Sequence, residues 1–165
     1  MKISAYWAGC DNFGDKLTKE ILNCIEGVDV YSEKPQYAKI VGAGSIVNRF
    51  EGTRGISYKY PLYVFGAGYN YKKALNQQFM RKLKVYAVRG KYTKEYIERV
   101  CVKELPSNVV LGDIGLLVGK LLPDGKVDKE YNLGIIPHYV DEEDSRFKYL
   151  EKRICGAKII SVRLE

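Results

Sequence analysis

The sequence predicts an α/β protein with a Rossmann-like, doubly wound parallel sheet. Short apolar runs recur along the 165-residue chain, and each is followed by glycine or polar residues. Several of these runs lead into stretches with the apolar period of an amphipathic helix, so strands and helices are expected to alternate. Such alternation is typical of a parallel sheet covered by helices. The chain is long enough to bury a full core, and residues 1–165 are predicted to form a single domain.

The expected elements follow the apolar periods in chain order. The strands are expected at 2–7, 28–31, 38–42, 62–66, 84–88, 108–111, 133–137 and 158–162. The helices are expected at 15–26, 72–81, 91–102, 114–121 and 143–154.

The stretch 91–102 has the clearest helical pattern. One side of this helix is expected to carry Tyr92, Tyr96, Ile97, Val100 and Cys101 and to pack on the sheet. Residues 46–61 contain aromatic residues, arginines and glycines without a clear period, which predicts a mobile loop beside the site.

Composition and charge narrow the class of protein. With 27 Lys and Arg against 20 Asp and Glu, the net charge of +7 favours phosphorylated ligands or contact with an anionic membrane surface. The basic residues are dispersed, so nucleic-acid binding is not expected. The four cysteines are scattered, which predicts reduced thiols and no metal centre. The first apolar run is too short for a signal peptide and no run is long enough to span a membrane, so a cytoplasmic protein is expected.

The first candidate site is the turn from Asn12 to Asp15, between an apolar run and an amphipathic stretch. Open α/β proteins bind ligands at such strand-to-helix turns. The start of the helix offers unpaired N–H groups and the positive end of the helix dipole, which favours an anionic ligand. Asp15 is interpreted as a base or a hydroxyl acceptor, or alternatively as a first-turn carboxylate stabilised by the helix dipole.

Two glycine turns follow later strands, Gly42-Ala43-Gly44-Ser45 and Gly66-Ala67-Gly68-Tyr69. Neither has the third glycine of a dinucleotide-binding motif. Small residues at a strand end let backbone N–H groups approach a phosphate, a carboxylate or a sugar hydroxyl. The alternative is that each glycine merely allows a tight turn.

Three more polar residues are expected at strand ends. Arg89 is suited to bidentate binding of phosphate or carboxylate, or alternatively to a salt bridge. Asp113 is expected to accept sugar hydroxyls, to pair with Arg89 or to cap the following helix, and these roles can coexist. His138 is the single histidine and is a candidate general acid or base.

Six short motifs, in this order, resemble the polysaccharide pyruvyl transferase family, and most closely the ketal pyruvyl transferases of bacterial exopolysaccharide and capsule synthesis. The motifs are Asn12-Phe13-Gly14-Asp15, Gly42-Ala43-Gly44-Ser45-Ile46, Val64-Phe65-Gly66-Ala67-Gly68-Tyr69, Ala87-Val88-Arg89-Gly90, Gly112-Asp113-Ile114-Gly115-Leu116-Leu117 and Ile135-Ile136-Pro137-His138-Tyr139.

The resemblance implies transfer of pyruvate from phosphoenolpyruvate to two hydroxyls of a sugar as a ketal, with no cofactor. It implies two Rossmann-like halves, as in GT-B-type transferases, with the site between them. His138 and Asp15 are then expected to be catalytic, with a sugar or lipid-linked saccharide as acceptor. The substrate-binding residues would be Asn12, Gly14, Gly42, Gly44, Ser45, Gly66, Gly68, Tyr69, Arg89 and Asp113.

The chain departs from the family in two respects. Family members continue into a second half with a His-Gly motif, which is absent here, and their Gly-Asp-Pro-Ala motif has Ile114 and Gly115 in its last two places. We therefore expect the amino-terminal half of such an enzyme, inactive without its carboxy-terminal domain, or a naturally shortened relative. The alternatives are a non-catalytic sugar- or nucleotide-binding or interaction module, in which an exposed apolar wall drives homodimerisation, and half of a GT-B-like glycosyltransferase.

Overall fold

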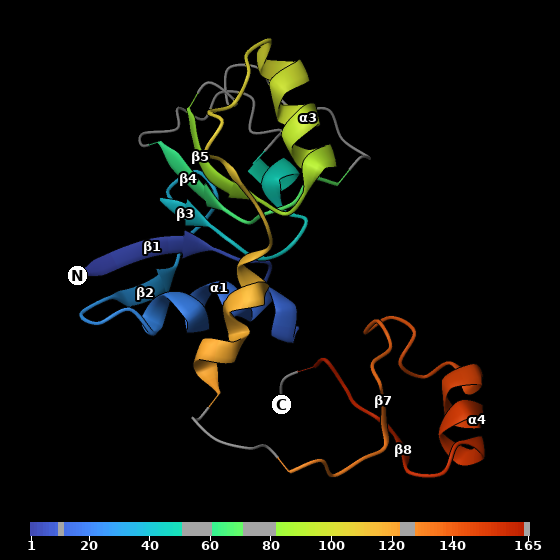
Figure 1. The fold of residues 1–165 in the computed structure, drawn as a ribbon. Helices are drawn as coiled ribbons and strands as arrows, with labels where there is room; N and C mark the ends of the chain where they lie inside the picture. The colour runs from blue at the N-terminus through green and yellow to red at the C-terminus, as the bar shows by residue number, and fades with distance from the viewer. Residues whose placement is uncertain (10–11, 51–60, 71–81, 123–127, 164–165) are drawn as a thin grey trace.

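A parallel six-stranded sheet forms the centre of the protein (Figure 1). The computed structural model describes residues 1–9, 12–50, 61–70, 82–122 and 128–163. The strand order is β2-β1-β3-β4-β5-β6, and each neighbouring pair is parallel. The predicted α/β class and parallel sheet are therefore confirmed. The strands are β1 (Lys2–Tyr6), β2 (Asp29–Ser32), β3 (Ile40–Val41), β4 (Leu62–Phe65), β5 (Leu83–Val88) and β6 (Val110–Leu111).

Two of the described helices cross between sheet strands and lie on opposite faces. Helix α1 (Phe13–Asn23) leads from β1 to β2, while α3 (Lys91–Cys101) leads from β5 to β6 in the other direction along the sheet. Because such crossovers are right-handed, opposite directions place the two helices on opposite faces. Alternating side chains fit this arrangement, since Val41 packs in the cluster that contains Ile97 of α3 and Ile40 packs against the cluster of α1.

Two short 3₁₀ helices follow strands β3 and β6. Helix η1 (Val47–Phe50) is a 3₁₀ helix with Val47 and Phe50 buried, so the prediction of a loop is wrong for this part of 46–61. Its apolar residues pack in the core cluster with Val41 and Val64, a contact that a periodicity search over four residues misses. The expected helix at 114–121 is present as the 3₁₀ helix η2 (Ile114–Leu121). Residues 51–60 and the expected helix at 72–81 lie outside the described residues.

Helix α3 packs the expected stripe on the core except for Tyr92. Tyr92 is 62% exposed, whereas Thr93 and Ile97 are buried. The Thr93 hydroxyl accepts a hydrogen bond from the Tyr69 N–H at 3.3 Å, which turns this polar residue toward the sheet. Tyr96 and Val100 pack against the core as predicted. The prediction for Tyr92 is wrong because a buried hydrogen bond, rather than hydrophobicity alone, sets the rotation of the helix.

The last two strands form a sheet of their own instead of extending the first. Strands β7 (Leu133–Ile135) and β8 (Ala157–Ile159) pair in parallel, and α4 (Ser145–Arg153) connects them. The segment that follows β8 contacts the start of α1, where the Phe13 N–H donates to the Val162 carbonyl at 2.8 Å. In the described part of the chain, no helix is long and apolar enough to cross a membrane.

Candidate functional site

The carboxyl ends of β1 and β3 form the switch point of the sheet, because the connections after these neighbouring strands run in opposite directions. Open α/β sheets bind ligands in the crevice at this point. Helix α1 begins here, with the Asn12 side chain accepting a hydrogen bond from the Gly14 N–H at 2.8 Å. Asp15 lies in the first turn of α1, and its carboxylate would be 3.1 Å from a Cβ atom at Gly44. The chain segments that contain Asn12, Asp15 and Gly44 therefore meet.

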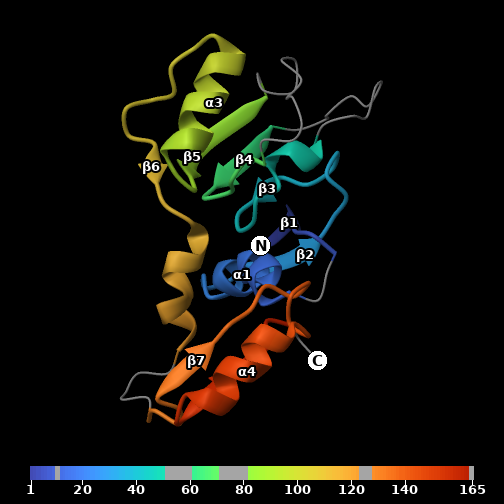
Figure 2. The ribbon, with the colours of Figure 1, turned by 90° about the vertical axis from the view of Figure 1, so that its right-hand side faces the viewer.

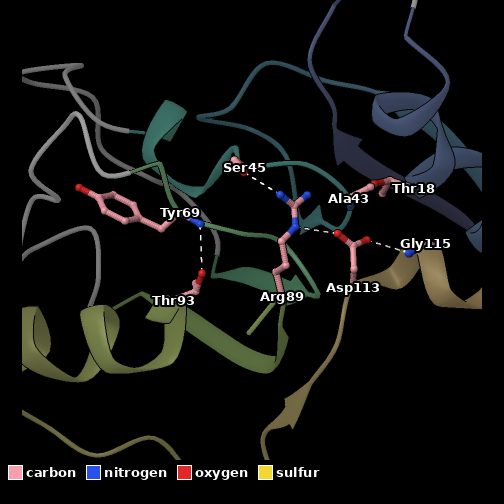
Figure 3. Close-up of polar contacts among 8 residues, drawn as sticks. All are labelled: Thr18, Ala43, Ser45, Tyr69, Arg89, Thr93, Asp113 and Gly115. Carbon is pink, nitrogen blue, oxygen red and sulfur yellow. Dashed lines mark hydrogen bonds and ion pairs between the residues drawn. The ribbon is translucent and has the colours of Figure 1, made fainter. Parts of the chain in front are cut away.

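Arg89 follows β5 and contacts both Ser45, which follows β3, and Asp113, which follows β6 (Figure 3). Its Nε donates to Oδ2 of Asp113 at 2.7 Å, and its NH1 donates to the Ser45 hydroxyl at 2.7 Å. Ser45 is 44 residues away from Arg89 in sequence and Asp113 is 24 residues away. The side chains of Arg89 and Asp113 are 41% and 28% exposed, so the cluster is open to solvent and to a ligand.

Asp113 fills two of its three predicted roles at once. Besides pairing with Arg89, its Oδ1 accepts a hydrogen bond from the Gly115 N–H at 2.8 Å and caps η2. The two roles use different carboxylate oxygens, so they do not compete. Because the ion pair is partly exposed, we expect it to orient Arg89 more than to stabilise the fold.

The glycines of the two turns are required by packing. A Cβ atom at Gly42 would lie 2.8 Å from the Thr18 hydroxyl, and one at Gly68 would lie 3.2 Å from Cδ of Arg89. Gly66 has a φ of +91°, and a Cβ atom there would collide with the main chain of Gly112 and Ile114. These residues are small because neighbouring segments touch them, so their size by itself does not indicate a ligand.

Hydrogen bonds within the protein occupy three N–H groups of the second turn, including that of Gly66, and one of the first. The Ala43 N–H donates to the buried Thr18 hydroxyl at 2.7 Å, and the Gly68 N–H donates to the Gly44 carbonyl at 2.9 Å. The Tyr69 N–H is bonded to Thr93, as described above. Within the described residues, the N–H groups of Gly44 and Ser45 have no acceptor. The first turn is therefore the better place for an anionic ligand, and Arg89 lies beside it.

Thr18 and Thr93 position the site but were not among the predicted residues. Each is buried and holds the main chain of one glycine turn against a helix (Figure 3). The sequence contains one signal that identifies them, namely a threonine within the apolar stripe of an amphipathic helix. A polar residue in that position has to find a hydrogen-bond partner inside the protein.

Tyr69 does not join the Arg89 cluster. Its side chain is 7% exposed, and its ring stacks on the ring of Tyr96 with 3.9 Å between the centroids. Figure 3 shows this ring extending away from Arg89 and Asp113. In this conformation Tyr69 fixes the second turn to α3 and does not present its hydroxyl to the cluster.

His138 lies in the βαβ unit and not at the edge of the main sheet. It is exposed, its Nδ1 accepts a hydrogen bond from the Val140 N–H at 3.4 Å, and its ring lies against that of Tyr139. The Tyr139 carbonyl accepts a hydrogen bond from Arg163, which forms an isolated bridge with Asn12. His138 is thus near residues that contact the start of α1, but no hydrogen bond connects it to the other described site residues.

The fold and the site define a doubly wound α/β protein with a polar cluster at the carboxyl edge of its sheet. Comparison of the chain with known protein families, with curated proteins and with solved structures finds no match. Among the described residues, no group of three His, Cys, Asp or Glu side chains is placed to hold a metal ion. The chemistry available here is therefore that of an arginine, a carboxylate, a hydroxyl and two free backbone donors.

Proposed function

We propose that this chain is the amino-terminal half of a polysaccharide pyruvyl transferase, which transfers pyruvate from phosphoenolpyruvate to a sugar of a cell-surface polysaccharide. The observation that carries the proposal is the hydrogen-bonded cluster of Arg89, Ser45 and Asp113. Each of these residues belongs to a different motif of the resemblance, and the motifs are far apart in sequence. Their convergence at the ligand-binding edge of the sheet supports a common role.

The free donors of the cluster suit an anionic group of the substrate. Arg89 uses Nε and NH1 within the protein, and its NH2 has no acceptor in the described residues. This nitrogen and the N–H groups of Gly44 and Ser45 would bind a phosphate of a nucleotide-linked or lipid-linked saccharide. Asn12 and Asp15, at the start of α1, would accept hydroxyls of the sugar.

The reaction needs a proton donor and two hydroxyls of the acceptor. Protonation of the terminal carbon of phosphoenolpyruvate gives an oxocarbenium-like centre that one sugar hydroxyl attacks. Loss of phosphate and attack by the second hydroxyl then close the ketal, with both hydroxyl protons released. His138 or Asp15 would relay these protons.

A second α/β half, as in GT-B-type transferases, is part of the proposal. The parallel unit β7-α4-β8 supports it, because its strands form a second sheet separate from the first. His138 follows β7 on that unit, so a cleft between two halves would bring His138 and Asp15 to opposite walls. The proposed location is the cytoplasm, and the net charge of +7 would assist contact with a lipid-linked acceptor at a membrane surface.

Binding by the chain itself tests the acceptor site. We expect UDP-N-acetylglucosamine, used as a probe, to shift the amide resonances of Gly44, Ser45 and Arg89. Arg89→Lys removes the planar donor pair and should weaken binding at least about tenfold. Lys152→Glu, on the exposed surface of α4, serves as the control and should bind like the unaltered chain. Shifts confined to other regions, or equal binding by Arg89→Lys, would overturn the assignment of the cluster.

Turnover distinguishes the proposed reaction from its alternatives. The protein translated from the complete reading frame is incubated with phosphoenolpyruvate and a panel of nucleotide sugars, and inorganic phosphate and UDP are measured separately. Phosphate release that requires both phosphoenolpyruvate and a sugar supports the pyruvyl transferase. UDP release without phosphoenolpyruvate would indicate a glycosyltransferase, and sugar binding without either product would indicate a binding module.

A further inference from the structure

A cavity of about 540 Å³ lies beside the first half of β5, away from the site described above. Its lining includes Leu83 and Val85 of β5 together with Leu105 and Val109 from the connection between α3 and β6. Figure 2 shows this connection running down the side of the sheet to β6. The cavity exists because β6 is short and pairs with only Ala87 and Val88, at the end of β5.

Among the described residues, part of the main chain of β5 has no hydrogen-bond partner on the side of this cavity. Successive residues of a strand direct their N–H and C=O groups to opposite edges. The Leu62 N–H of β4 donates to the Lys82 carbonyl at 3.3 Å, so Lys82 faces β4 and Leu83 faces the other edge. Val85 follows two residues later, before the register shift of this strand pair, and faces the same edge as Leu83.

The described residues that line the cavity leave these groups without partners. No described residue of the 103–109 connection forms a hydrogen bond with the main chain of Leu83 or Val85. These two residues are about 6.6 Å apart along the strand, a spacing that the alternate residues of another extended chain reproduce. Free N–H and C=O groups along a strand edge are a template for pairing with another chain.

We propose that this groove, lined by 83–86 and 103–109, binds an extended acidic peptide segment of a partner protein, which adds to β5 as a short strand in line with β6. Hydrogen bonds to Leu83 and Val85 would supply the main-chain recognition. One face of the added strand would pack on the apolar side chains of Leu105 and Val109.

The charges that line the groove determine which peptide fits. The lining contains two lysines, Lys84 and Lys103, and one carboxylate, Glu104, so its net charge is positive. Acidic residues at alternate positions of the peptide would pair with the lysines. The residues between them would be β-branched and apolar, since these favour an extended strand and match the apolar part of the lining.

A designed peptide tests the proposal directly. The probe is an acetylated and amidated seven-residue peptide in which aspartate alternates with valine. We expect it to bind the full chain with a dissociation constant below about 1 mM. In hydrogen-exchange NMR it should protect the amide protons of Leu83 and Val85. No binding at 1 mM, or protection confined to other amides, would overturn the proposal.

Two control peptides separate main-chain pairing from simple charge attraction. One carries N-methyl groups on its valines and the other on its aspartates, and each modification removes the donors from one edge of the strand. One of the two should bind at least tenfold more weakly than the parent, while the other retains binding. Equal binding by both would exclude strand addition.

Charge reversal in the protein tests the choice of partner. The double substitution Lys84→Glu and Lys103→Glu should abolish binding of the aspartate peptide and permit binding of its lysine counterpart. The matched control is Lys129→Glu with Lys152→Glu, two exposed lysines outside the groove, which should change neither result. Circular dichroism confirms that each variant is folded. Protection of Leu83 and Val85 that rises with protein concentration in the absence of peptide would overturn the proposal, because it would place a second copy of the chain in the groove.

Discussion

The six-stranded sheet and the β7-α4-β8 unit are both built from parallel strands and crossing helices, but among the described residues the buried apolar clusters belong to the first. Val41, Val64 and Val88 of the main sheet are fully buried. Helix α4 has no buried residue, and its Tyr149 and Leu150 are 59% and 41% exposed. A parallel sheet normally has both faces covered. The same strand-helix-strand pattern is therefore packed against buried apolar side chains in the main sheet, whereas the described residues of α4 are not buried.

Different interactions hold the helices of the two regions. Helix α1 is anchored by Leu17 and Ile21 in a buried cluster and by the bond from Ala43 to Thr18. Helix α4 depends on local bonds, including its cap at Asp144 and the bond from the Ile159 N–H to the Glu151 carboxylate at 2.8 Å. Burial of apolar area is the larger stabilising effect, so the two regions should respond differently to equivalent substitutions.

The largest difference is expected from removing an apolar side chain in each region. Phe50 is 2% exposed and packs edge-on against Tyr6, with 5.2 Å between the ring centroids. Phe50→Ala should lower the free energy of unfolding by about 3–5 kcal/mol, because it leaves a cavity in the core. Leu150→Ala in α4 should change it by less than about 0.5 kcal/mol. Urea denaturation of both variants measures the contrast, and a large effect of Leu150→Ala would show that α4 has a buried face.

A smaller effect is expected from the buried hydrogen bond that fixes the first glycine turn. Thr18 is fully buried, and Thr18→Val keeps its shape while leaving the Ala43 N–H without an acceptor. The expected loss is about 1–3 kcal/mol of unfolding free energy. Thr18→Ser, which retains the hydroxyl, is the control and should lose less than the valine variant. If valine were tolerated better than serine, packing rather than the hydrogen bond would hold the turn.

The smallest effect concerns the pH dependence of α4. The side chain of Arg146 donates to the Asp144 carboxylate, and the Arg146 N–H does so as well, which together lower the Asp144 pKa to about 2 from its ordinary value of 3.8. A lowered pKa in the folded state adds stability above the ordinary value, and this contribution is lost as the pH falls through about 2. Relative to the intrinsic exchange rate at each pH, amide exchange in α4 should therefore accelerate between roughly pH 4 and pH 2.

The substitution Asp144→Asn provides the control for this pH dependence. Asparagine retains the cap but cannot titrate, so its α4 exchange should lack the acceleration assigned to Asp144. An NMR titration of the Asp144 carboxyl measures the pKa itself. A value near 3.8 would show that the pair with Arg146 does not persist in solution.

Part of the candidate site was predictable because its features are local. Asn12 and Asp113 occupy helix starts, and their capping bonds reach only two residues along the chain. The pairing of Arg89 with Asp113 was one of three alternatives, since the sequence indicates that both follow strands but not that these strands are neighbours. Ser45 and Arg89 were each predicted as site residues, yet nothing in the pattern predicted the hydrogen bond between them.

The misplaced predictions have a common physical cause. Tyr92 was assigned to the buried stripe on hydrophobicity, but Thr93 is inside because it satisfies the Tyr69 N–H. The N–H groups of the second turn were expected to approach a ligand, and those of Gly66, Gly68 and Tyr69 are bonded within the protein instead. Both outcomes depend on which hydrogen-bond partners the fold brings close, and these partners are distant in sequence.

The sequence alone determined the alternation of strands and helices, the parallel class of the sheet and the polar residues at the strand ends. These properties follow from apolar periods and capping residues, which act over a few neighbours. Only the tertiary structure decided that β7 and β8 form a separate sheet, that Arg89 binds Ser45, and that a short β6 leaves an open groove beside β5. Strand order and side-chain pairing depend on the packing of the whole chain, and no local window of sequence contains that information.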